Sequence, residues 1–152
     1  MKYYISDLHL FHPAILQKCS RPFATIDDMH RTIFQNWKKK GIGPCDEVYI
    51  LGDVGMYHEK EIGKFLMALP GKKYAFLWCR PYAEVRDNER KVVLFHYPIE
   101  EWNGFYVGSY HLHGHIHNTT VTHIDRRYNV SVDVINYTPV TLDELIAQND
   151  VK

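Results

Sequence analysis

The chain has 152 residues, which is the size of one ordinary domain, so we expect a single domain over residues 1–152. Lys plus Arg number 18 and Asp plus Glu number 18, and this balance excludes an extended surface for nucleic acid or anionic lipid. With 45% hydrophobic and 24% charged residues, the composition excludes a disordered or fibrous chain. Histidine is abundant: there are ten, and five lie between His111 and His123.

Nothing in the sequence indicates export or membrane insertion. Residues 1–7 lack the apolar core of a signal peptide, and no apolar run approaches the roughly 20 residues of a membrane helix. Cys19, Cys45 and Cys79 are odd in number and widely spaced, which argues against disulfides and against a thiolate zinc site. We therefore expect a cytoplasmic protein with no membrane partner.

Taken in chain order, short apolar runs alternate with helical patterns. Strands are predicted over 3–5, 48–51, 74–78, 92–95 and 130–135. A helix is predicted to begin after Thr25 and to end before Gly41, and a second one to span 58–69. The capping box Thr141-x-x-Glu144 predicts a third helix. This order predicts an α/β fold on mixed sheets rather than a purely parallel doubly wound sheet.

Acidic and histidine residues stand at the ends of several predicted strands. Asp7 and His9 follow the first strand, at the end where α/β proteins place their ligand sites. Asp53 follows Gly52 at the end of the second, and His96 closes the run before Tyr97-Pro98. Each of these residues taken alone is explained at least as well by an ordinary turn or a structural side chain. Their significance lies in their occurring together.

The segment His-Gly-His-Ile-His that begins at His113 is the strongest single signal. Two-residue spacing puts His115 and His117 on one side of an extended chain, and Gly114 lets the backbone bend so that both imidazoles converge on a metal or a metal pair. A solvent-facing polar strand explains the alternation but not the choice of histidine at every polar position. We assign His111 and His113 to the outward face.

Together these positions form a mixed oxygen and nitrogen ligand set: Asp7, His9, Asp53, His96, His115 and His117. Two Asp and four His without Cys suit divalent Mn, Fe, Zn or Ni. A catalytic zinc usually keeps three protein ligands, so six are too many for one ion. The set suits two metals that share one carboxylate.

These motifs, in this order, resemble those of the calcineurin-like metallophosphoesterases, and most closely their small single-domain bacterial and phage-type branch. The resemblance covers nearly the whole chain and implies a four-layer αββα sandwich of two mixed β-sheets flanked by helices. It implies that one metal is held by Asp7, His9, Asp53 and His117, and the other by Asp53, His96 and His115, with Asp53 bridging.

The activity that the resemblance implies is hydrolysis of phosphomonoesters or phosphodiesters by a hydroxide that bridges two metals, Mn being one candidate ion. The partner would be a small phosphate ester such as a nucleotide. Two further residues are candidates near the site. His12 could replace an acid at the rim, the alternative being a surface histidine, and Arg21 could contact substrate phosphate, the alternative being a surface salt bridge.

One block of the family is absent. After the third strand the family carries Gly-Asn-His, whose Asn completes the second metal site and whose His stabilises or protonates the leaving oxygen. Here residues 77–82 read Leu-Trp-Cys-Arg-Pro-Tyr, and Asn88 belongs to a predicted hairpin turn over 86–90. Three explanations stay open: the loop is deleted, a working variant replaces it, or the sequence lacks residues between Leu77 and Tyr82.

Two other function classes stay open, and the absent block bears on the first of them. One is a catalytically impaired metal-binding homologue that acts as a scaffold or regulator. The other is a histidine-rich protein that stores or senses a single metal.

Overall fold

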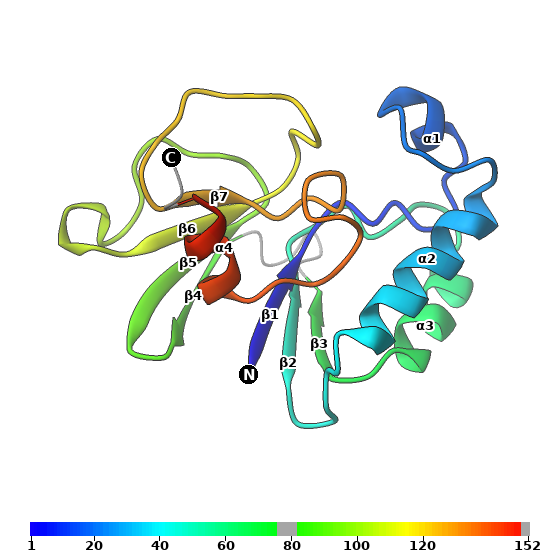
Figure 1. Cartoon of the computed structure of the whole chain (residues 1–152), viewed down its shortest axis with the longest axis horizontal. Helices are drawn as coiled ribbons and strands as arrows, with labels where there is room; N and C mark the ends of the chain where they lie inside the picture. Colours follow the sequence, from blue (N-terminus) through cyan, green and yellow to red (C-terminus); the bar gives the residue numbers. More distant parts are fainter. Residues whose placement is uncertain (76–81, 150–152) are drawn as a thin grey trace.

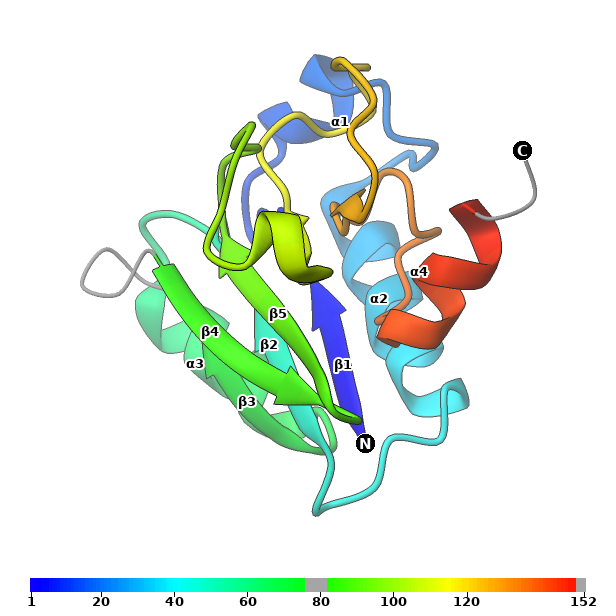
Figure 2. The same cartoon turned by 90° about the vertical axis from the view of Figure 1, so that its left-hand side faces the viewer.

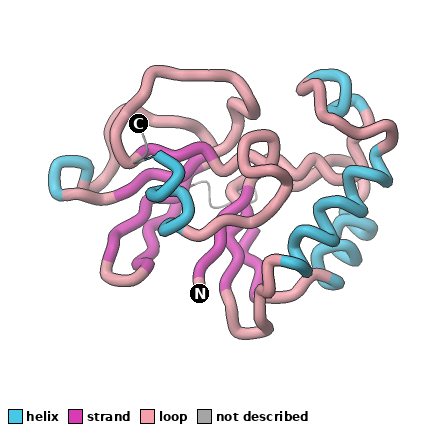
Figure 3. Tube along the Cα trace, viewed as in Figure 1, coloured by secondary structure: helices cyan, strands magenta, loops and turns pink. Residues whose placement is uncertain are grey.

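A computed structural model describes residues 1–75 and 82–149 of the chain. Its elements, in order, are β1 (Lys2–Ile5), α1 (Ala14–Lys18), α2 (Ile26–Lys39), β2 (Glu47–Ile50), α3 (Glu59–Ala68), β3 (Lys72–Ala75), β4 (Tyr82–Asp87), β5 (Arg90–Phe95), the 3₁₀ turn η1 (Phe105–Val107), β6 (Tyr110–His113), β7 (Arg127–Asn129) and α4 (Leu142–Asn149). Figures 1 and 3 show short elements joined by long loops, above all between β6 and α4. Among the described residues, no helix has the length and apolar character needed to cross a membrane.

The strands form two sheets. The first has the order β1-β2-β3 and both of its pairings are parallel, whereas the second has the order β4-β5-β6-β7 and combines one antiparallel pair with two parallel ones. The prediction of an α/β fold is confirmed in this form, with four α-helices and two sheets among the described residues. The expectation that both sheets are mixed is wrong for the first sheet, because helices connect its strands and return each one in the same direction.

The helices lie mainly on one side of the first sheet. Figure 1 shows α2 and α3 covering the face that points away from the second sheet. Helix α4 instead contacts β1, the edge strand, where Tyr4 pairs with Val140 in an isolated bridge. Figure 2 shows α4 beside β1 from the second direction. Of the four predicted layers, the described residues therefore form the two sheets and the helical layer of α2 and α3.

Both sheets contribute to a single hydrophobic core. Ile5 and Ile50 from the first sheet and Leu94 and Leu112 from the second are all 0% exposed and belong to one cluster. Helix α2 adds Trp37, which is also fully buried. Because one core joins the two sheets, the ends of their strands are held in a fixed relation to each other.

The helix-start signals are confirmed in detail. The Thr25 side chain accepts a hydrogen bond from the Asp28 N–H at 3.1 Å, as an N-cap does. At α4, the Glu144 carboxylate accepts from the Thr141 N–H at 2.8 Å, and the Glu144 N–H donates to the Thr141 hydroxyl at 3.3 Å. These capping hydrogen bonds join residues that are close in the sequence, so they form without contacts from distant residues.

Two strand predictions need correction. The run 130–135 is a turn rather than a strand: only Ser131 makes a bridge, to Ser6, and the preceding residues 127–129 form β7. Val130 and Val132 are nevertheless fully buried, so the apolar run indicated burial and not extension. The predicted strand 74–78 is described only up to Ala75, as the end of β3.

Strands β4 and β6 had not been predicted from the sequence, whereas the predicted turn over 86–90 does join β4 to β5.

Candidate metal centre

The loops that leave β1 and β2 run alongside each other. The His9 N–H donates to the Asp53 carbonyl at 2.9 Å, and the Asp7 N–H donates to the Gly52 carbonyl at 3.2 Å. The parallel pairing of β1 with β2 therefore continues beyond the strands. As a result, the two predicted motifs Asp7-x-His9 and Gly52-Asp53 lie next to each other.

Most of the candidate ligands have an uncommon backbone conformation. Positive φ angles occur at Asp7 (58°), His9 (47°), Asp53 (45°), His115 (68°) and His117 (50°). In this left-handed region a side chain other than glycine costs on the order of 1–3 kcal/mol, and such residues gather at functional sites, where the surrounding structure holds them. The strain is thus concentrated on five of the six residues that the sequence singles out.

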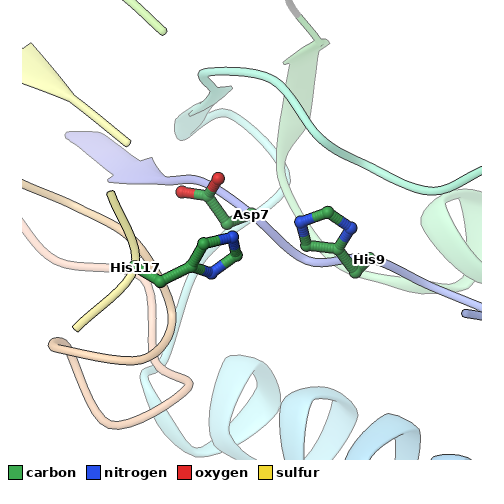
Figure 4. A group of neighbouring side chains, drawn as sticks. All are labelled: Asp7, His9 and His117. Atoms are coloured by element: carbon green, nitrogen blue, oxygen red, sulfur yellow. The ribbon is translucent and has the colours of Figure 1, made fainter. Parts of the chain in front are cut away.

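The structure brings the six predicted residues together in two groups. The first group is Asp7, His9 and His117, shown in Figure 4, and the second is Asp53, His96 and His115. Within each group, one candidate ligand atom from every residue lies within 4.8 Å of the others. The division is the one that the family resemblance implies, while the binding of metal itself stays a prediction.

The Asp53 carboxylate stands between the two groups. Its Oδ2 atom lies 3.4 Å from Nε2 of His9, in the first group, and 3.6 Å from Nε2 of His96, in the second. The side chain of Asp53 is 44% exposed, whereas those of His9 and His96 are 11% and 13% exposed. One carboxylate therefore faces both groups and solvent at the same time.

His115 and His117 do not alternate along an extended chain. Both have positive φ, and the Ile116 N–H donates to the Gly114 carbonyl at 2.8 Å, so the segment is a tight turn. The prediction that the two imidazoles lie on one side of an extended chain is wrong. The turn sends His115 to the second group and His117 to the first.

The assignment of His111 and His113 to the outward face is also wrong. They are 0% and 2% exposed, and burial lowers the pKa of each imidazole to about 4. His111 is paired at both ring nitrogens, since Nδ1 lies 3.2 Å from the Val93 carbonyl and Nε2 accepts from the Ile99 N–H at 3.3 Å. These two histidines are neutral parts of the core at pH 7.

Two motif glycines pack directly against candidate ligands. A Cβ at Gly52 would lie 2.6 Å from Nδ1 of His96, and a Cβ at Gly114 would collide with the carboxylate of Asp7 and the hydroxyl of Ser6. Gly52 also has φ of +122°, which L side chains rarely adopt. Both glycines are therefore needed for the close approach of backbone to side chain.

The charges in the centre favour an ionised carboxylate. Contacts with His9 and His96 hold the pKa of Asp53 well below its usual value. Burial lowers the pKa of His96, but contact with Asp53 and the neighbouring carboxylates outweighs burial and raises it overall. Burial and the proximity of His96 lower the pKa of His115. The centre thus holds an anionic oxygen among imidazoles, as a cation site requires.

The buried atoms of the first group fit a divalent cation. Nε2 of His9 is buried, and its contact with Oδ2 of Asp53 at 3.4 Å lacks the geometry of a hydrogen bond. A buried polar atom without a well-formed hydrogen bond is costly, and a metal ion would satisfy it. Carboxylates and imidazoles are also the donors that first-row divalent ions accept.

His12 lies next to the first group. Its Nδ1 is 3.4 Å from Nδ1 of His9, and its side chain is partly buried. Burial and the proximity of His9 lower the pKa of His12. At neutral pH it therefore offers an uncharged imidazole at the edge of the centre.

Arg21 has surroundings that do not fit the predicted contact with substrate phosphate. Its side chain is 0% exposed, and it pairs with Asp133 through Nε at 2.8 Å and Nη2 at 2.9 Å. Asp133 also lies 2.7 Å from Nδ1 of His117, and Arg21 and His117 together outweigh burial and lower its pKa to about 2. Sequence reasoning missed Asp133, although it is the one charged residue in the apolar run 130–135.

The absent Gly-Asn-His block concerns residues 77–82. Of these the structure describes only Tyr82, the first residue of β4. The choice among deletion, replacement and missing residues therefore lies outside the described part of the chain.

Comparison with known proteins places the chain among relatives. No family model matches it. It is 31% identical to the uncharacterized protein MJ1445 of Methanocaldococcus jannaschii over 160 residues, which cover 95% of this chain and 88% of the archaeal protein. The chain belongs to the family of that protein.

Three solved structures are similar to this chain. Protein AQ665 of Aquifex aeolicus, of unknown function, has a TM-score of 0.74 and 21% identity over 97% of this chain and 98% of its own, so the two share a fold. YfcE, a phosphoesterase from E. coli, has a TM-score of 0.45 and 14% identity over 86% and 77% of the two chains. A predicted phosphoesterase of Streptococcus pneumoniae has a TM-score of 0.41 and 10% identity over 86% and 70%.

Proposed function

We propose that this protein is a cytoplasmic, metal-dependent phosphoesterase that hydrolyses phosphomonoesters or phosphodiesters at a centre of two divalent ions. The observation that supports this proposal is the position of Asp53, whose Oδ2 lies 3.4 Å from His9 in one ligand group and 3.6 Å from His96 in the other. A carboxylate shared by two groups of three ligands is the arrangement that a pair of ions needs. The same arrangement argues against a protein that stores or senses a single ion.

The residues that would hold the ions follow from the two groups. Asp7, His9 and His117 would bind one ion, and Asp53, His96 and His115 the other, with Asp53 bridging. Two divalent ions so held would lower the pKa of water and neutralise the charge on a phosphoryl group. Mn, Fe, Zn and Ni all accept this set of donors.

A backbone hydrogen bond orients the imidazole of His96 in the centre. Nδ1 of His96 donates to the Leu51 carbonyl at 2.9 Å, which leaves Nε2 directed at Asp53. Because the pKa of Asp53 is held low, its carboxylate stays ionised throughout the neutral range. Its 44% exposure lets a small phosphate ester, such as a nucleotide, approach from solvent.

Aromatic and histidine side chains border the centre. Tyr97 is 49% exposed, and its ring centroid lies 4.4 Å from that of His115 and 5.0 Å from that of His96. It therefore forms a wall against which an ester group can pack. Beside the first group, the neutral imidazole of His12 could donate a hydrogen bond to the leaving oxygen in place of the absent family histidine.

A second candidate function is a catalytically impaired metal-binding scaffold or regulator. The observation that favours it is the missing Gly-Asn-His block in the sequence. Loss of general acid help typically lowers a rate 10²–10⁴-fold without removing the metal ligands. Such a protein would bind two ions and turn over slowly or not at all.

The test is an assay of the purified full chain with Mn²⁺ and a chromogenic phosphodiester or phosphomonoester, together with a count of bound ions. We expect metal-dependent hydrolysis that a chelator removes and Asp53→Asn abolishes. The matched control is Asp125→Asn, which alters an exposed His–Asp pair between Asp125 and His123. Two bound ions without hydrolysis would support the scaffold, and a single ion unaffected by Asp53→Asn would support storage or sensing.

A further inference from the structure

A buried ion pair lies behind the first ligand group. The guanidinium of Arg21 and the carboxylate of Asp133 make two hydrogen bonds, of 2.8 and 2.9 Å, and their side chains are 0% and 3% exposed. The two residues are 112 positions apart in the sequence. Neither belongs to the six candidate ligands, and neither is open to a substrate in solvent.

The Asp133 carboxylate has a full set of donors. Besides the two bonds from Arg21, its Oδ2 accepts from the Ser131 hydroxyl at 3.1 Å and lies 2.7 Å from Nδ1 of His117. Since a carboxylate only accepts, the proton in this contact belongs to Nδ1 of the imidazole. In a neutral ring, Nε2 of His117 then carries no proton, as a metal ligand requires.

Arg21 also binds the backbone at Asp7, another member of the first group. Its Nη2 donates to the Asp7 carbonyl at 2.8 Å, and its Nη1 donates to the Leu8 carbonyl at 3.2 Å. The backbone at Asp7 has a positive φ of 58° and needs external support. One guanidinium therefore ties the loop after β1 to the turn that carries Asp133.

We propose that Asp133, held in place by Arg21, is a positioning residue that fixes the imidazole of His117 with Nε2 toward Asp7 and His9, and so sets the affinity of the first ion site. The proposal rests on the proposed function only in taking that site to bind a divalent ion. In this role Asp133 touches neither the ion nor the substrate. Among the described residues, no hydrogen bond joins the side chains of the second group, Asp53, His96 and His115, to Arg21 or Asp133, so the ion affinity of the second group should change little when the pair is altered.

The decisive variant is Asp133→Asn in the full chain. An amide has one acceptor oxygen, for which Arg21 and His117 compete, and its nitrogen can donate to Nδ1 of His117 and drive the proton to Nε2. Arg21→Lys is the second variant, because it keeps the charge but cannot make the paired bonds. Asp125→Asn, in the exposed pair with His123, is the matched control.

Two measurements test the proposal. Long-range ¹H–¹⁵N NMR of the metal-free protein should show His117 protonated at Nδ1, and Asp133→Asn should shift it toward protonation at Nε2. Calorimetric titration with Mn²⁺ should show one of the two ions bound about 10–100-fold more weakly in Asp133→Asn and in Arg21→Lys, with the other unchanged. Asp125→Asn should behave as the unaltered protein in both measurements.

Three results would overturn the proposal: protonation of His117 at Nε2 in the unaltered protein, unchanged affinity for both ions in a folded Asp133→Asn, or an equal loss at both sites, which indicates a purely structural role. If Asp133→Asn does not fold, Arg21→Lys and the tautomer of the unaltered protein decide. The proposed hydrolysis is judged separately, because the tautomer and the ion affinities are measured without a phosphate ester. Absence of Mn²⁺ binding by the unaltered protein would overturn the affinity claim and the proposed function together, and the tautomer would still test the orientation of His117.

Discussion

Gly52 lies against the imidazole of His96, so closely that a Cβ on the glycine would stand 2.6 Å from Nδ1. The same ring nitrogen donates to the carbonyl of Leu51 at 2.9 Å, on the residue just before the glycine. The turn after β2 thus both supplies Asp53 and fixes the orientation of His96. A small residue at this point is a requirement of the centre.

Gly52→Ala should therefore weaken the second ion site. The added methyl group would displace His96, and the φ of +122° would be strained for alanine. We expect Mn²⁺ titration to show loss of one high-affinity ion and a fall in hydrolysis. Gly63→Ala is the control. Gly63 lies in helix α3, and apart from its chain neighbours and the backbone of its own helix no described atom lies within 4 Å of its Cβ position. The free energy of unfolding of this variant should rise by up to about 1 kcal/mol. Full binding of both ions by Gly52→Ala would contradict the role given to the glycine.

Asp53→Asn should disable the centre more severely than loss of a single-site ligand. The variant removes the anionic oxygen that lies within 3.6 Å of imidazoles from both groups. Loss of several kcal/mol of charge stabilisation corresponds to a fall in kcat/KM of at least about 10²-fold. Steady-state kinetics with a chromogenic phosphodiester measure this effect. A variant that hydrolyses the ester at the native rate would rule out a bridging role for Asp53.

Divalent ions should stabilise the fold. Ligand that binds only the native state adds RT ln(1 + [L]/Kd), which is about 2.7 kcal/mol at 100 times Kd. The buried Nε2 of His9, which makes no well-formed hydrogen bond, gives a structural reason to expect this gain. Thermal unfolding with Mn²⁺ should show a Tm several degrees higher than with EDTA, and less of a rise in His9→Gln. An equal Tm with and without ions would count against the metal centre.

The protein should lose stability in mild acid through His111. Burial lowers the pKa of His111 from 6.5 to about 4, so below pH 6.5 the unfolded chain takes up a proton that the folded chain does not. Stability is full above pH 6.5 and falls as the pH drops toward 4, by on the order of 2 kcal/mol between pH 7 and pH 5 for this residue.

Urea unfolding at pH 7 and at pH 5 measures this loss. His111→Asn should be less stable at pH 7 and should depend less on pH over this range, because the titrating group is gone. His123→Gln, at a side chain that is 68% exposed, should keep the native pH dependence. An unchanged pH dependence in His111→Asn would show that other groups carry it.

The sequence by itself was sufficient to predict the helix caps and to identify the candidate ligands. The N-cap at Thr25 and the capping box at Thr141 depend on residues within four positions, so they can be recognised without the fold. Asp7, His9, Asp53 and His96 were identified because they follow apolar runs, and the ends of neighbouring strands in an α/β fold meet at one edge. Apolar runs by themselves were less informative, since the run 130–135 is buried yet not a strand.

The tertiary structure decided how these residues are used. Positive φ angles at His115 and His117 turn the chain and send the two imidazoles to different groups, which the alternation rule for extended chains does not anticipate. Burial of His111 depends on packing between strands and loops that are distant in sequence. The pairing of Arg21 with Asp133 spans 112 positions, and no local pattern encodes a contact between two charges that only the folded chain brings together and removes from water.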